Sequence, residues 1–164
     1  MLDLWKAYRG RRAAAAAIIP FVDGTRRRLG GIPDSAWHDP YVVGFLGMLI
    51  TVITTRLLGS LSTDALAAVQ AGAWTDITGM PGDIVGEEIL FLGTSRDNRF
   101  IVGCGNAETF FRALDAASRR TEQNLGAGAD ALPASESVED KPGSSLWSRY
   151  FDAYLVGPLP DVET

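Results

Sequence analysis

The stretch Tyr41–Thr55, YVVGFLGMLITVITT, runs for fifteen residues without a charged side chain and decides the fold of this chain. As a helix it would span about 22 Å, which is short of the roughly 30 Å hydrocarbon core of a bilayer. Arg56 is the one charge between Pro40 and Thr63, so a helix over 41–61 would cover about 32 Å. Three threonines and two glycines within the run argue against spanning. We predict the central helix of a helical bundle, and a membrane-spanning or embedded helix at 41–61 is the alternative.

The start of this helix carries clear local signals. Asp39 is a good N-cap residue, and Pro40 suits the first helical position. Gly44 and Gly47 are three residues apart and share one face, so the backbone of another helix could approach closely there.

The remainder of the first 123 residues indicates further helices. We predict an alanine-rich helix over 2–19 that ends before Pro20, followed by a loop over 23–39. Apolar spacing and caps predict helices after Ser62 and over 106–120. Residues 87–105 fit either a short β-hairpin near 89–103 or a helix capped by Asp97, and we favour the helix. The predicted fold is mainly α: a single helical bundle-like domain over 1–123.

The C-terminal part of the chain has a different composition. Residues 124–145 lack aromatic residues and are rich in Gly, Ala, Ser and acidic groups, which predicts a flexible acidic linker before a helix over 146–156 and a tail over 157–164. That helix is amphipathic, because its apolar residues follow helical spacing. It is too short to be stable alone, so it must dock on its own core, on another protein or on a second copy. The predicted partner-binding residues are Trp147, Tyr150, Phe151, Tyr154 and Leu155.

Charge is distributed unevenly along the chain. Residues 1–33 carry seven basic and two acidic groups, although the whole chain has a net charge of −5. The candidates for binding an anionic partner, such as an anionic membrane surface, are Arg9, Arg11, Arg12, Arg26, Arg27 and Arg28. The competing interpretation is that this basic region packs against the acidic remainder of the chain. A nucleic-acid partner is disfavoured, because the body is acidic and no binding module is recognisable.

Motifs for catalysis are weak. Cys104 and His38 are each the single residue of their type, and a Cys–His nucleophilic dyad is conceivable but nothing in the sequence places the two together. One acidic cluster stands out within the predicted domain: Asp83, Glu87, Glu88 and Asp97. We expect no metal and no cofactor, because neither zinc-ligand spacing nor a phosphate-loop or dinucleotide fingerprint is present.

The sequence therefore predicts a cytoplasmic, non-enzymatic protein-interaction or assembly module that uses its C-terminal aromatic helix. A single cysteine suits a reducing compartment. Two alternatives stay open: a membrane-associated protein with a spanning or embedded helix at 41–61, and a small enzyme or ligand-binding domain that uses Cys104 and His38 or the acidic cluster.

Overall fold

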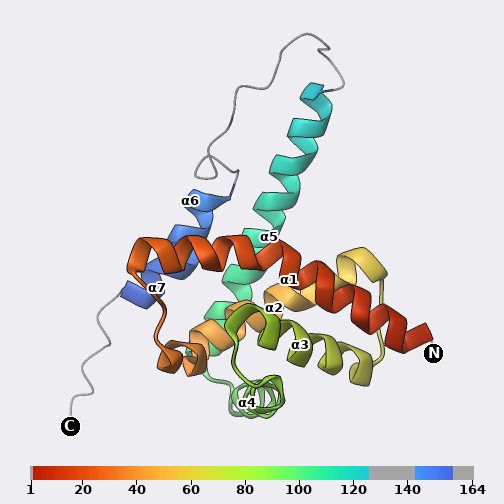
Figure 1. Cartoon of the computed structure of the whole chain (residues 1–164), viewed down its shortest axis with the longest axis vertical. Helices are drawn as coiled ribbons and strands as arrows, with labels where there is room; N and C mark the ends of the chain where they lie inside the picture. The colour runs from red at the N-terminus through yellow and green to blue at the C-terminus, as the bar shows by residue number, and fades with distance from the viewer. Residues whose placement is uncertain (1, 126–142, 157–164) are drawn as a thin grey trace.

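The computed structural model describes residues 2–125 and 143–156, and the regular structure within these ranges is entirely helical (Figure 1). This confirms the predicted mainly α, bundle-like fold. The elements are α1 (Leu2–Leu29), the 3-10 helix η1 (Asp34–His38), α2 (Pro40–Leu58), α3 (Thr63–Thr78), α4 (Gly82–Ser95), α5 (Asn98–Leu125), α6 (Ser144–Trp147), the π-helical turn η3 (Ser148–Asp152) and α7 (Ala153–Val156).

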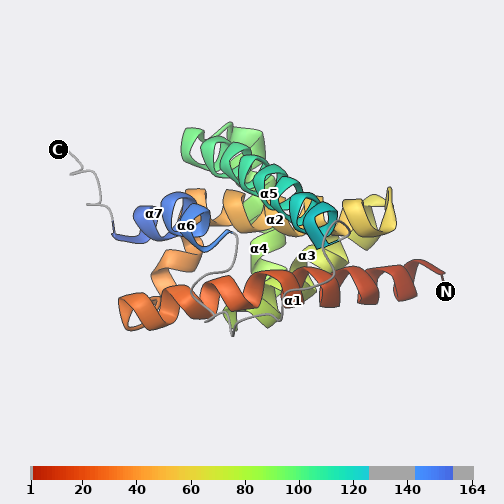
Figure 2. The same ribbon diagram turned by 90° about the horizontal axis from the view of Figure 1, so that it is seen from above.

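Helix α2 is the central element of the bundle, and α1, α3, α4 and α5 all pack against it. Figure 2 shows it running between α1 on one side and α5 on the other. The predicted cap is present, because a carboxylate oxygen of Asp39 accepts a hydrogen bond from the Tyr41 N–H at 2.9 Å. By length and composition alone α2 could cross a membrane, yet 56% of its apolar eighteen-residue window is buried against other parts of the protein. In this fold α2 serves as the core helix.

Glycines allow α2 and α5 to pack backbone against backbone. The α-carbon of Gly44 faces the Phe100 carbonyl, and that of Gly103 faces the Tyr41 carbonyl. A Cβ atom at either position would overlap the carbonyl oxygen opposite. Gly47 instead faces the side chain of Ile89, from α4, where a Cβ would lie 3.1 Å from the nearest atom. The predicted close backbone approach therefore occurs at Gly44, where α5 packs, and is wrong at Gly47, which meets a side chain of α4.

The predicted end of the first helix at Pro20 is wrong, and so is the loop predicted from residue 23. Helix α1 continues through Pro20 to Leu29, and Arg26, Arg27 and Arg28 form its last turn. Proline removes one helical hydrogen bond, the one to the Ala16 carbonyl, but Ala16 and Pro20 both lie on the exposed side of α1. Water can satisfy that carbonyl there. Burial of Val22 and Thr25 against the core holds the following turns in place.

Residues 87–105 form no hairpin. Helix α4 ends at Ser95, Arg96 turns the chain with a positive φ of 55°, and α5 begins at Asn98. A carboxylate oxygen of Asp97 accepts a hydrogen bond from the Phe100 N–H at 2.9 Å, so the helical alternative that we favoured, with Asp97 as its cap, is correct.

The division between domain, linker and C-terminal helix lies partly outside the described residues. Helix α5 extends to Leu125, so the first two residues of the predicted linker belong to it. The rest of that linker up to residue 142, and the predicted tail over 157–164, fall outside the ranges described here. The predicted helix over 146–156 is present and begins two residues earlier, at Ser144.

Candidate docking site of the C-terminal helix

Residues 144–156 form one continuous helical segment that contains a π-helical turn. The backbone is α-helical at both junctions of the turn, with φ and ψ of −58° and −37° at Ser148 and of −59° and −30° at Ala153. The segment lies against the C-terminal half of α1 and beside α5 (Figures 1 and 2). Single π-helical turns inside helices occur frequently at functional sites. We refer to residues 144–156 as the C-terminal helix.

Two aromatic residues of the C-terminal helix complete the core. Trp147 and Phe151 are both fully buried. The Trp147 ring stacks on Phe21 of α1, with centroids 5.2 Å apart, and meets Phe45 of α2 and Phe110 of α5 edge-on at 5.6 Å each. Burial of an aromatic side chain of this size stabilises a fold by about 2 kcal/mol or more. We call the set Phe21, Phe45 and Phe110 the aromatic docking site.

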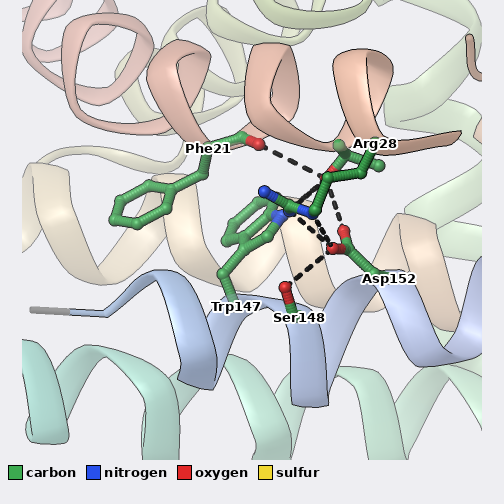
Figure 3. A network of polar contacts seen from close by, with 6 residues as sticks. Phe21, Arg28, Trp147, Ser148 and Asp152 are labelled. Atoms are coloured by element: carbon green, nitrogen blue, oxygen red, sulfur yellow. Dashed lines mark hydrogen bonds and ion pairs between the residues drawn. The ribbon is translucent and has the colours of Figure 1, made fainter. Parts of the chain in front are cut away.

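A polar network centred on Asp152 fastens the C-terminal helix to α1 (Figure 3). The Asp152 carboxylate accepts hydrogen bonds from the Thr25 hydroxyl at 2.5 Å, the Ser148 hydroxyl at 2.9 Å and the Arg28 guanidinium at 2.5 and 2.8 Å. The Trp147 indole N–H donates to the Thr25 oxygen at 2.8 Å. Asp152 and Thr25 are buried, so each polar group needs these partners. We call these five residues the Asp152 latch.

Tyr41 of α2 makes a second polar contact with the C-terminal helix. Its hydroxyl donates a hydrogen bond to the Tyr150 carbonyl and accepts one from the Asn106 amide at 3.0 Å. The Tyr41 ring also stacks on Tyr154, with centroids 3.6 Å apart and planes only 6° from parallel. Because Tyr41 is buried, the pKa of its hydroxyl is raised well above the ordinary value of 10.

The predicted partner-binding residues divide into an inner and an outer group. Trp147 and Phe151 are enclosed by the core, and Tyr150 and Leu155 are half-buried. Tyr154 remains 43% exposed even though its ring covers Tyr41. In the structure the helix lies on its own core, which is one of the three docking possibilities that the sequence left open.

The six predicted anion-binding arginines also divide into two groups. Three are paired with carboxylates of the same chain: Arg11 with Asp76 at 2.7 Å, Arg26 with Asp23 at 2.9 Å and Arg28 with Asp152 at 2.5 Å. Among the side chains that the structure describes, the other three have no carboxylate within ion-pair distance: Arg9, Arg12 and Arg27. The basic region thus packs partly against acidic groups of its own chain, and its other three arginines are exposed and pair with none of the described carboxylates.

Cys104 and His38 contact different groups and do not form a dyad among the described contacts. The Cys104 thiol donates to the Gly44 carbonyl at 3.5 Å, and burial raises its pKa, which disfavours the reactive thiolate. The His38 Nδ1 lies 3.2 Å from a carboxylate oxygen of Glu88. A catalytic role for this pair has no geometric support.

The acidic cluster is dispersed as well. Glu88 pairs with His38 and Asp97 caps α5, whereas Asp83 and Glu87 lie on the exposed side of α4. In the part of the chain that the structure describes, no group of three or more His, Cys, Asp or Glu side chains could hold a metal ion.

A cavity of about 770 Å³ opens beside the Asp152 latch, between α1 and the start of the C-terminal helix. Its lining combines small or apolar residues of α1 with arginine and serine side chains: Ala16, Ala17, Pro20, Phe21, Gly24, Arg27, Arg28, Ser144, Ser145 and Ser148. A smaller cavity of about 400 Å³ lies between α2 and α5.

Sequence reasoning missed the polar half of the docking site. Thr25 and Asp152 were not singled out, although Asp152 is the one acidic residue between Ser144 and Val156 and stands next to a buried phenylalanine. An isolated acidic residue within an aromatic stripe, in a chain that carries an arginine cluster elsewhere, could have suggested the Arg28–Asp152 ion pair. Comparison with protein-family models, curated proteins and solved structures finds no match for the chain.

Proposed function

We propose that this protein is a non-enzymatic assembly module in which the C-terminal helix is the ligand and the aromatic docking site is its receptor. The observation that carries the proposal is the full burial of Trp147 and Phe151. Trp147 contacts aromatic rings of α1, α2 and α5, and Phe151 contacts Phe45 of α2. Recognition of an amphipathic helix through buried aromatic anchors is a common mode of protein interaction.

The partner in this proposal is a second copy of the chain. The contacts that seat the C-terminal helix on its own domain would be the same if that helix came from another molecule, so two copies can exchange helices without losing any of them. Residues 126–142 separate α5 from the C-terminal helix. Seventeen residues can span at most about 60 Å when extended, which is enough for the helix to reach a neighbouring molecule.

The proposed assembly depends on protein concentration. A short tether keeps the helix of the same chain at an effective concentration on the order of millimolar. Docking within one chain therefore dominates in dilute solution. We expect the fraction of molecules that exchange C-terminal helices to rise at high protein concentration, or when two copies are unfolded and refolded in the same solution. This activity needs neither a thiolate nor a metal. A cytoplasmic location is part of the proposal, because the single cysteine has no disulfide to form within the chain.

Charge reversal across the Asp152 latch provides the test. In an Arg28→Asp chain and in an Asp152→Arg chain, like charges face each other, and docking within each chain should be weakened. In an equimolar mixture, the helix of the first variant still carries Asp152 and can dock beside Arg28 of the second variant. The helix of the second variant, with its new positive charge, can dock beside the new negative charge of the first. We expect each variant alone to be a monomer of about 17.6 kDa and the mixture to form a dimer by light scattering after size exclusion.

The double variant, with Arg28→Asp and Asp152→Arg in one chain, is the matched control and should remain a monomer. Its amides over 144–156 should again be protected in hydrogen exchange, as in the original protein. If the mixture stays monomeric while both single variants lose this protection, helix exchange between copies is wrong.

A further inference from the structure

The outward face of α1 carries exposed aromatic rings next to arginines. Trp5 and Tyr8 are 56% and 57% exposed, whereas Trp37, Trp74 and Trp147 are each at most 3% exposed. The Arg9 guanidinium lies 4.6 Å from the Trp5 ring centroid. The Arg12 guanidinium lies 5.8 Å from the Tyr8 ring centroid and donates to the Tyr8 hydroxyl at 3.3 Å.

Arginines on this face keep their charge available. Arg9, Arg12 and Arg27 have no carboxylate partner within the described residues, and all three are exposed. They recur at the spacing of one helical face. Asp23 falls on the same side of α1, but Arg26 binds it at 2.9 Å and neutralises it. The face is therefore positive on a protein whose net charge is −5.

Between Arg12 and Arg27 the exposed side chains of this face are short and uncharged. Ala16 and Pro20 are the exposed residues there, and neither carries a long side chain that would keep a flat surface away. Both also line the cavity of about 770 Å³ that opens beside Arg27. Helix α1 has 28 residues, so the face extends over about 42 Å.

We propose that this face of α1, the α1 stripe (Trp5, Tyr8, Arg9, Arg12 and Arg27), binds the surface of a bilayer that contains anionic phospholipid. Tryptophan and tyrosine prefer the headgroup region of a membrane, where an apolar ring and a polar edge are both accommodated. Arginines beside them are attracted to anionic headgroups, and the acidic body is repelled, which orients α1 towards the lipid. Helix α2 stays in the core and does not enter the membrane.

A nucleic acid would fit this face less well. Affinity for nucleic acid comes largely from phosphate contacts, and the stripe has three arginines, unpaired among the described residues, on a protein of net charge −5. Half-exposed Trp5 gains more by entering a lipid interface. The stripe shares no residue with the Asp152 latch or the aromatic docking site, so the lipid proposal stands or falls independently of helix exchange.

The test uses the full chain and vesicles of phosphatidylcholine with or without phosphatidylglycerol. Trp5 is the exposed tryptophan of the described part, so quenching of its fluorescence by brominated acyl chains reports the contact directly. We expect sedimentation with the anionic vesicles only, together with quenching. Each basic residue near an anionic membrane surface contributes to the free energy of binding. Removing three of them in one chain, through Arg9→Gln, Arg12→Gln and Arg27→Gln, should therefore weaken binding roughly 100-fold.

The matched control removes three arginines from α5 instead, through Arg112→Gln, Arg119→Gln and Arg120→Gln, with the same change in net charge. This control should bind the anionic vesicles at close to full strength, whereas Trp5→Ala should weaken binding and abolish the quenching. Equal loss in the two triple variants, sedimentation without Trp5 quenching, or equal binding to neutral vesicles would each overturn the proposal.

Discussion

Two glycines in α5, two residues apart, should respond in opposite ways to the same substitution. Gly103 is buried against α2, and a Cβ there would overlap the Tyr41 carbonyl oxygen and lie 2.9 Å from the Phe45 backbone nitrogen. Gly105 is exposed, and a Cβ there would meet nothing within 4 Å. Comparing Gly103→Ala with Gly105→Ala isolates the backbone contact between α2 and α5.

The expected magnitudes follow from these surroundings. Alanine is favoured over glycine in a helix interior, so Gly105→Ala should stabilise the protein by about 0.5–1 kcal/mol. At Gly103 the atoms in the way belong to backbone and cannot rotate aside, so α2 and α5 must separate. Overpacking of this kind costs about 1–3 kcal/mol. The free energies of unfolding of the two variants should therefore differ by about 3 kcal/mol.

Urea unfolding followed by far-ultraviolet circular dichroism and by tryptophan fluorescence measures this difference. With a urea dependence of about 2 kcal/mol/M, the two midpoints should lie roughly 1.5 M apart, with the original protein between them. Coincident transitions from both probes would support the two-state treatment. A Gly103→Ala protein as stable as the Gly105→Ala protein would refute the backbone contact, because nothing else distinguishes the two sites so sharply.

Three further predictions concern single side chains. Because burial raises the pKa of Tyr41, the stability that its neutral hydroxyl provides is complete below about pH 10 and is lost as the pH rises further. Denaturant titrations at pH 9 and 11 should show a steeper fall for the original protein than for Tyr41→Phe, and parallel behaviour would contradict this. Asp152→Ala should cost about 2–3 kcal/mol in urea unfolding, because Arg28 and Thr25 lose their shared acceptor; the more exposed Asp115→Ala should cost less than about 1 kcal/mol, and equal costs would remove the latch from the energetics. Because burial raises the pKa of the Cys104 thiol, Ellman's reagent at pH 8 should react with the folded protein much more slowly than with the urea-unfolded chain, and equal rates would show that the thiol is accessible.

The sequence predicted correctly those helix starts that depend on interactions between neighbouring residues. Asp39, Ser62 and Asp97 were recognised or favoured as caps, and each accepts a backbone hydrogen bond at a helix start. A cap acts within three residues, so the sequence alone carries the information. The charge-free run at Tyr41–Thr55 identified the core helix for a related reason, since a helix that is apolar on every side needs neighbours on every side.

Pro20 shows where local reasoning failed. Taken by itself it predicts a helix end, yet α1 runs through it. The cost of one lost hydrogen bond on the exposed side is outweighed by the burial of Ile18, Val22 and Thr25 on the other. That balance depends on which face of α1 meets the core, and contacts distant in sequence decide it.

For the candidate docking site, too, the sequence predicted the local element and the tertiary structure supplied its contacts. From its apolar spacing alone the sequence determined that residues 146–156 form an amphipathic aromatic helix that must dock. Only the tertiary structure showed how it lies against its own chain, through an Arg28–Asp152 pair separated by 124 residues. It also decided which arginines pair: among the described residues Arg9, Arg12 and Arg27 have no carboxylate partner. Ion pairing depends on which carboxylate lies within a few ångströms in space, and sequence separation does not report that distance.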